Sequence, residues 1–355
     1  MTILDRYLAR TILQHTLMVM AVLLALMSLV TFINQQDDIG QGTFEVADAF
    51  FVTLLLMPQQ AYELLPIGAL IGSITGLGAL ARDSELTVIR SAGVPVARIA
   101  ASAAMAGAVV AATLWIVGEY FAPPADLYAR QYKIFSRYGQ LEIAGSRSAW
   151  VREGAWFINV RQQAASNLFG GVYLHELGSD RRLRLVGRAE TARQDAEGRW
   201  VLSNYAETRL DGARIEARGR ALEVTGARFD AGFLGLAVTE PGSLPLAELQ
   251  AYRRHLQENR QDARVWDIAF WSRVARLAAA VVVCVFAVPF AFGPLRQAGA
   301  GARTVLGIMA GVLFILLTQT LENSGQVYGL NPLLVAWGPT LLMAAVAAFA
   351  IWRTR

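Results

Sequence analysis

Lysine is almost missing from this sequence. The chain has 32 lysine and arginine residues among its 355 residues, and Lys133 is the only lysine. The phosphate-binding loop of nucleotide hydrolases needs a lysine in the pattern GxxxxGK[ST], and the residues around Lys133 do not fit that pattern. The chain therefore does not hydrolyse ATP through such a loop. If it moves a substrate with the energy of ATP, another subunit must supply that energy.

Cysteine and histidine are also scarce. The single cysteine, Cys284, lies in an apolar stretch, so an intrachain disulfide is excluded. The three histidines, His15, His175 and His255, are far apart in the sequence, which leaves metal binding and nucleophilic catalysis without a scaffold. We therefore expect no cofactor and no metal site, and we expect that the chain is not an enzyme.

Charge is low and apolar residues are abundant. Only 17% of the residues are charged, 55% are hydrophobic, and the mean hydropathy is +0.39, which is typical of integral membrane proteins. A helix needs about 20 residues to cross a bilayer. Six apolar blocks reach that length with their flanks, near residues 13–33, 49–81, 97–120, 268–292, 304–321 and 333–352. We predict six transmembrane helices, of which the second has the least certain limits because Pro58 and Pro66 interrupt it.

Arginine is distributed unevenly between the connections. Residues 82–98 contain three arginines, 296–303 contain two, and arginines also lie near both ends of the sequence, whereas 34–48 carry four acidic residues and no basic one. Basic residues in short loops mark the cytoplasmic side. Both termini and the 82–95 loop are therefore expected in the cytoplasm. The same bias accounts for much of the net charge of +4, so we expect no nucleic-acid partner.

A polar region separates the third and fourth apolar blocks. Within it, residues 140–240 alternate between apolar and polar types, as in 156–160, and turn signals such as 152–154 interrupt them. This pattern predicts an all-β sandwich or jelly roll, and 244–262 have helical spacing instead. The predicted plan is transmembrane helices in 1–124 and 263–355, with a β-jelly-roll-like domain at 125–262 inserted between them on the outer side.

The loop RDSELTVIRSAGVP at 82–95 predicts a short helix over 83–93. Asp83 or Ser84 can cap its first turn, where Glu85 is also favourable. Gly93 can end the helix and Pro95 prevents its continuation, while Leu86 and Ile89 give it an apolar side. A helix of this length is marginal alone in water, so it must pack against something. The residues leave two interpretations open: an ordinary positive-inside connection, or an element that receives the motion of a separate ATPase.

Several short motifs occur in an order and spacing that resemble a known family. They are LDRY (4–7), GQG (40–42), SEL (84–86), SAG (91–93), GEYFAP (118–123), GPLR (293–296) and VYG (327–329). On these residues the chain resembles the lipopolysaccharide export permeases of the LptF/LptG family, and most closely the LptG branch. The resemblance runs from end to end and is weakest in the β insertion.

The resemblance implies a permease subunit of an ATP-driven exporter in the inner membrane of Gram-negative bacteria. It implies an LptF-like permease as heterodimer partner, a dimer of the ATPase LptB, and a periplasmic bridge of LptC and LptA type that receives lipopolysaccharide. It also places the β domain in the periplasm. The coupling helix of the family matches 83–93, so Glu85, Leu86 and Ile89 are the expected contact with LptB.

Lipopolysaccharide carries phosphates, which favour cations near the membrane surface. Arg130, Lys133 and Arg137 follow the third span at intervals of three and four, so they share one face if the helix continues outward. They are the first candidates for phosphate contact. The alternative is that they anchor the helix at the interface by snorkelling. Arg273 and Arg276, at the outer end of the fourth span, are the second candidate pair.

The sequence departs from the family where relatives often place lysines. At the outer end of the first span it has Asp37 and Asp38 instead. Either the Arg130 group and the partner permease hold the phosphates, or divalent cations link phosphate to these carboxylates. Glu63, inside the second span, is named on general grounds, and the alternative is that it lies at the outer interface with access to water. Two other functions also remain open: a permease for another lipid-linked cargo, and a membrane scaffold that does not transport.

Overall fold

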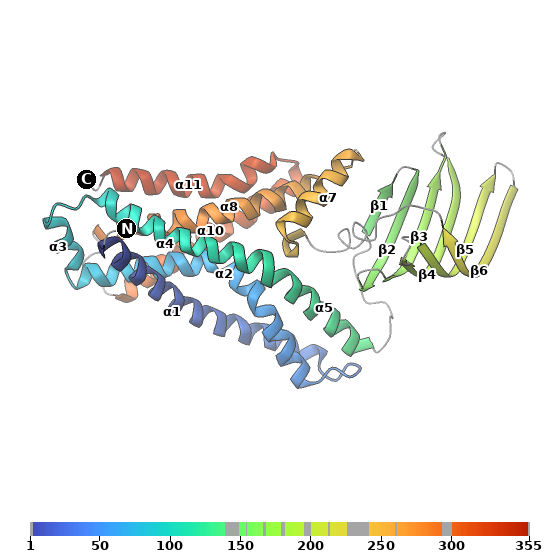
Figure 1. The fold of residues 1–355 in the computed structure, drawn as a ribbon, viewed down its shortest axis with the longest axis horizontal. Coiled ribbons are helices and arrows are strands. Elements are labelled where there is room, and N and C mark those ends of the chain that lie inside the picture. Colours follow the sequence, from blue (N-terminus) through green and yellow to red (C-terminus); the bar gives the residue numbers. More distant parts are fainter. Residues whose placement is uncertain are drawn as a thin grey trace. The chain divides into compact units, whose positions relative to one another are not determined.

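The computed structural model describes residues 3–138, 149–153, 155–165, 168–178, 182–194, 200–211, 214–225, 241–259, 261–292 and 300–353. The chain divides into two compact units (Figure 1). The helical unit comprises Met1–Asp37, Ala49–Tyr128 and Arg264–Arg355. The β unit comprises Asp38–Asp48 and Ala129–Ala263. The 38–48 segment, which connects the first two spans, thus belongs to the β unit.

Among the described residues, six helices are long and apolar enough to cross a membrane, which confirms the predicted number of spans. They are built from α1 (Ile3–Asn34), α2 (Val46–Arg82), α4 (Val96–Ile116), α8 (Arg264–Phe286), α10 (Ala300–Tyr328) and α11 (Pro332–Arg353). The 3₁₀ turn η1 (Gln36–Asp38) follows α1. The third span continues through the π-helical segment η2 (Val117–Phe121) into α5 (Ala122–Tyr138), and the fourth continues into α9 (Val288–Phe292).

The second span is one helix despite its two prolines. Both Pro58 and Pro66 lie inside α2, and proline is tolerated in membrane helices where neighbouring groups satisfy the freed backbone. The most apolar 18-residue stretch of α2 is 78% buried, the highest share among the six spans. The sequence alone left the limits of this span uncertain because proline tends to interrupt a helix, whereas packing against neighbouring helices keeps this one continuous.

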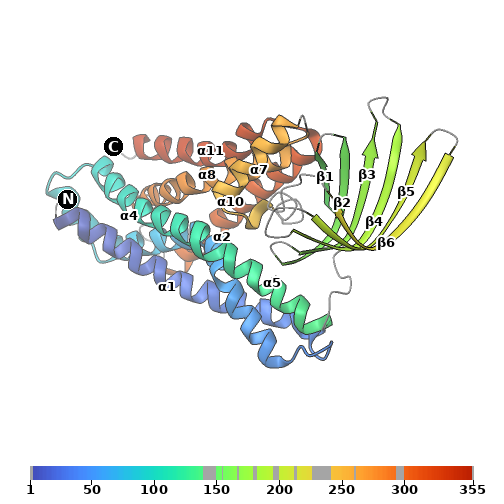
Figure 2. The same cartoon turned by 45° about the vertical axis from the view of Figure 1, so that its right-hand side comes forward.

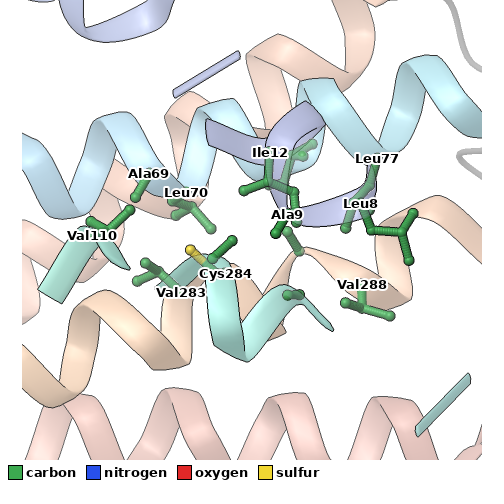
Figure 3. Close-up of a cluster of buried hydrophobic side chains, with 14 of the residues drawn as sticks. Leu8, Ala9, Ile12, Ala69, Leu70, Leu77, Val110, Val283, Cys284 and Val288 are labelled. Carbon is green, nitrogen blue, oxygen red and sulfur yellow. The ribbon is translucent and has the colours of Figure 1, made fainter. Parts of the chain in front are cut away.

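The core of the helical unit lies between α1, α2, α4 and α8. Its buried side chains include Leu8, Leu70, Val110 and Cys284, and Figure 3 shows several of them pointing toward one another. Glycines bring these helices close together. A Cβ on Gly107 of α4 would lie 2.7 Å from the Cα of Val281 on α8, and such small residues allow close packing of membrane helices.

Two spans are covered much less by the rest of the chain. In α1 and in α10, only 11% of the most apolar stretch is buried. Exposed apolar side chains of α10 include Met309, Val312, Leu313 and Leu316. Apolar surface of this extent marks contact with lipid or with another protein. The least covered surface of the helical unit is therefore on α1 and α10.

The described residues of the β unit form one antiparallel sheet, which confirms the predicted inserted β domain. Its strands are β1 (Ala149–Glu153), β2 (Trp156–Ala165), β3 (Leu168–Leu177), β4 (Leu183–Gln194), β5 (Trp200–Asp211) and β6 (Arg214–Thr225). Each described strand pairs with its neighbours in the chain, in the order β1-β2-β3-β4-β5-β6, and the sheet is curved (Figure 2). The described strands thus form a meander, without the crossovers of a jelly roll among them. Alternation predicts strands and their buried face, but not which strands pair.

A separate small core fills one face of this sheet. It contains Ile158, Val172, Leu174 and Leu202 among others. After η3 (Pro241–Ser243), helix α7 (Leu246–Glu258) occupies the region where helical spacing was predicted, with Leu249 and Tyr252 buried. Burial raises the pKa of the Tyr252 phenol to about 12, because it removes water from the charged form.

Candidate functional site

The loop at 82–95 forms the predicted short helix, α3 (Glu85–Ser91). Ser84 precedes it with a left-handed φ of 62°, and no side-chain hydrogen bond from the described residues caps its first turn. Gly93, with φ +87°, follows its last turn, and the Gly93 amide donates to the Arg90 carbonyl oxygen at 2.9 Å. The expected glycine end is present, whereas the expected side-chain cap at Asp83 or Ser84 is not seen in this described part of the chain.

The apolar side of α3 packs against the helical unit. Leu86 is only 1% exposed and belongs to the main core, and Ile89 packs against the same core. Val88, in contrast, is 65% exposed. Packing on its own chain explains how so short a helix is stable. Within the chain, Leu86 holds α3 in place and has almost no exposed surface, so its contact with a partner stays a prediction.

Glu85 is held by the beginning of α1. The Tyr7 hydroxyl donates to Glu85 Oε2 at 2.6 Å. Nearby on α1, Asp5 accepts from the Ser102 hydroxyl at 3.0 Å and lies 3.9 Å from the Arg98 guanidinium, both on α4. The described ends of the chain, in α1 and α11, lie at the same end of the helical unit as α3 (Figures 1 and 2). The first turns of α1 therefore join α3 to α4.

Two of the three predicted cargo-binding cations have described side chains. Arg130 is exposed on α5, whereas the side chain of Arg137 lies outside the described residues. Lys133 Nζ lies 2.5 Å from Asp38 Oδ2, and their side chains are 27% and 14% exposed. Lys133 therefore has a carboxylate partner within its own unit. The sequence analysis named both residues but did not pair them.

Further hydrogen bonds attach the 38–48 segment to α5. The Tyr132 hydroxyl donates to Asp48 Oδ1 at 2.5 Å. The Thr43 amide and hydroxyl both donate to the Ser136 carbonyl oxygen, at 2.7 Å and 2.9 Å. Together with Asp38, these contacts fix the start, middle and end of the segment along one helix.

The second predicted pair of cations lies inside the helical unit. The guanidinium of Arg273 is 5.1 Å from the centre of the Tyr62 ring, and that of Arg276 is 5.0 Å from the same ring. Arg273 Nη1 also lies 3.9 Å from Glu119 Oε2 and donates to the Gly118 carbonyl oxygen at 3.4 Å. With a 5% exposed side chain, Arg273 joins α8 to α2 and η2 and is not presented at a surface.

This internal cluster follows from the cost of charge in a membrane. An ionised side chain there is expensive unless it is paired, and Tyr62 and Glu119 supply an aromatic face and a countercharge. Glu119 lies in the π-helical segment, a feature often found at functional sites. Sequence reasoning missed both partners, although Glu119 lies in the GEYFAP motif. Glu63, the carboxylate named in the second span, is exposed, and its Oε1 accepts a hydrogen bond from the Gln59 side-chain amide at 2.7 Å.

Known proteins match this chain over nearly its whole length, including the spans and the β unit. A family model described as "Lipopolysaccharide export system permease LptF/LptG" matches residues 6–353. The chain is 28% identical over 361 residues to the lipopolysaccharide export system permease protein LptG of Escherichia coli K12, covering 99% of this chain and 98% of that protein. It is 26% identical over 353 residues to LptG of Haemophilus influenzae, covering 99% of both. With six spans, an inserted β unit and a match that includes them all, the chain belongs to the LptF/LptG family of lipopolysaccharide export system permeases.

Proposed function

We propose that this inner-membrane, multi-pass chain is the LptG-like subunit of an ATP-driven exporter that extracts lipopolysaccharide from the inner membrane and passes it to a periplasmic bridge. The observation that carries the proposal is α3. A chain without a phosphate-binding loop holds a short helix firmly on its core, with Glu85 fixed by Tyr7 at 2.6 Å. Such a helix is suited to receive movement from a separate nucleotide-hydrolysing subunit, because its own packing passes that movement to the spans.

The same arrangement supports an orientation. Arginines cluster in the α3 connection and near the ends of α1 and α11, and these segments lie at one end of the helical unit (Figure 1). Since basic short loops stay in the cytoplasm, this end faces the cytoplasm. An odd number of spans then separates it from the β unit, which is periplasmic.

In the proposed complex, Glu85 meets a cation of an LptB-like ATPase, and the exposed Val88 adds an apolar contact beside it. Leu86 and Ile89 keep α3 attached to the core. The poorly covered spans α1 and α10 are where an LptF-like permease would pack, leaving a cavity between the two subunits for the acyl chains of the cargo. The β unit would pass the cargo to an LptC and LptA type bridge.

The function is tested by purifying the tagged chain from its native membrane. We expect an ATPase and a second permease to accompany it, and lipopolysaccharide to stimulate ATP hydrolysis by the complex. A purified lipoprotein, added as a control for another lipid-linked cargo, should give no stimulation. Purification without any ATPase would contradict the proposal and favour a scaffold that does not transport.

The cationic face of α5 gives a second test. Changing Arg130, Lys133 and Arg137 together to Ser should weaken lipopolysaccharide binding by at least about tenfold, because charge-assisted contacts to phosphate contribute roughly 1.5–3 kcal/mol each before screening. Basal ATP hydrolysis should not change, since the patch lies on the proposed periplasmic side. Binding is measured on the purified complex with labelled lipopolysaccharide.

The matched control replaces Arg209 and Arg218 with Ser. Both are exposed cations of the sheet and each lies 3.1 Å from a glutamate oxygen. Their loss should leave binding within about twofold, as is usual for exposed ion pairs. Equal weakening in the control and in the α5 variant would show a general charge effect and move the binding site away from α5.

A further inference from the structure

The contact between Asp38 and Lys133 has a consequence for how strongly the cargo is held. We propose that Asp38 is an internal counter-ion of Lys133, which the phosphate of a bound lipid must displace, so that Asp38 lowers the affinity of this site. The inference rests on the proposed function, because it takes the ligand of Lys133 to be a lipid phosphate. Asp38 is then a positioning residue that sets affinity through Lys133.

The geometry makes the Asp38 carboxylate and a lipid phosphate compete for the Lys133 ammonium group. Lys133 Nζ lies 2.5 Å from Asp38 Oδ2, and both side chains are largely covered, so water and salt screen this pair less than a fully exposed one. An ammonium group has three donors, but a phosphate approaching the same nitrogen would meet the negative charge of Asp38 at close range. Phosphate binding therefore requires Asp38 to move away.

Asp38 stays close after it is displaced. The 38–48 segment remains attached to α5 through Thr43 at Ser136 and through Asp48 at Tyr132. A tethered group competes at a high effective concentration, so the carboxylate returns to Lys133 when the phosphate leaves. A transport site must bind strongly enough for entry and weakly enough for exit, as in channels. Competition from Asp38 would keep phosphate binding weak enough for the lipid to leave.

This arrangement opposes the other interpretation of the acidic residues at this position. If a divalent cation linked phosphate to Asp38, that carboxylate would strengthen binding, and removing it or the cation would weaken binding. If Asp38 competes for Lys133, removing it strengthens binding and a chelator does not reverse the gain. The two mechanisms predict opposite signs for the same substitution. Arg130, exposed one turn earlier on α5, is present in both cases and does not affect the comparison.

The test is Asp38→Asn in the full complex, with lipopolysaccharide affinity measured at fixed ionic strength, with and without a chelator. We expect affinity to rise about threefold to tenfold, the usual range for one partly screened charged contact. Asp37→Asn removes the same charge one residue earlier and should change affinity less than about twofold. In a Lys133→Gln background, Asp38→Asn should give no gain, because its effect acts through Lys133.

A second measurement does not depend on lipid. Since Lys133 is the only lysine of the chain, amine-reactive labelling followed by peptide mass spectrometry reports on its amine directly. Asp38→Asn should speed this labelling several-fold while the midpoint of thermal unfolding stays near that of the wild type. Asp38→Ser serves in the same way if the asparagine variant does not fold.

The outcomes separate this inference from the proposed function. Suppose that the wild-type complex binds lipopolysaccharide, but Asp38→Asn gives no gain in affinity or Asp37→Asn gives an equal gain. This result overturns the proposed role of Asp38 and leaves the proposed function standing. Weaker binding in Asp38→Asn, together with loss of binding in chelator, overturns it in favour of a bridging cation. Absence of lipopolysaccharide binding by the wild-type complex overturns the cargo assignment and this inference together.

Discussion

Glu85→Lys is expected to remove the ATPase from the purified complex while the permease itself still folds and inserts. The side chain lies on the first turn of α3, at the end of the helical unit that we place in the cytoplasm. A lysine there would face the cation that we propose on the ATPase, and such a like-charge contact costs more than losing the attraction alone. The affinity for the ATPase should fall by more than about tenfold, or roughly 1.4 kcal/mol. Quantitative mass spectrometry of the purified complex measures the loss.

Two control variants make this result specific. Asp83→Lys makes the same type of change two residues earlier, at a 54% exposed side chain that pairs with Arg82, and it should retain the ATPase. Glu85→Gln keeps an oxygen that accepts from Tyr7 and should show an intermediate loss. Reversing the charge of the opposing ATPase residue should restore binding to Glu85→Lys. Full export by Glu85→Lys, with normal amounts of ATPase, would leave the 82–95 loop as a topological signal only.

The parts of the fold that follow from local signals were predictable. Apolar length gave the six spans, and Gly93 with the following proline gave the end of α3. Pro58 and Pro66 left only the limits of α2 uncertain, and the structure shows one continuous, largely buried helix there. The alternation pattern could not predict which β strands pair, because it repeats every two residues and fits several strand orders.

The candidate site was only partly predictable, because its contacts join distant parts of the chain. Tyr7 and Glu85 are 78 residues apart, and neither motif indicates the other. An amphipathic pattern shows that one side of a helix is covered, but not by what, so the packing of Leu86 within its own chain could not be read from the sequence. Lys133 was assigned to phosphate without regard to Asp38, since a spacing argument considers one helix at a time.

The second large effect is expected from removing the sheet. Replacing about residues 140–240 with a flexible linker should leave membrane insertion and ATPase binding intact, because the spans and their flanking arginines carry the topology. The sheet has a core of its own, formed by residues such as Ile158 and Leu202, which is separate from the core of the helical unit. Delivery of lipopolysaccharide to the periplasmic bridge should stop. Transfer from vesicles that contain the complex to a purified bridge protein measures this step.

The deletion should separate extraction from delivery. The spans, the α5 cations and α3 remain, so lipopolysaccharide should still stimulate ATP hydrolysis even though nothing reaches the bridge. In the intact chain, a photo-crosslinker at Leu174, which belongs to the buried face of the sheet, should capture lipopolysaccharide during turnover. At His175 it should not, because neighbouring strand residues point to opposite faces. Delivery at the wild-type rate after deletion would show that the cargo leaves the helical unit without the sheet, and the β unit would then serve assembly and not transfer.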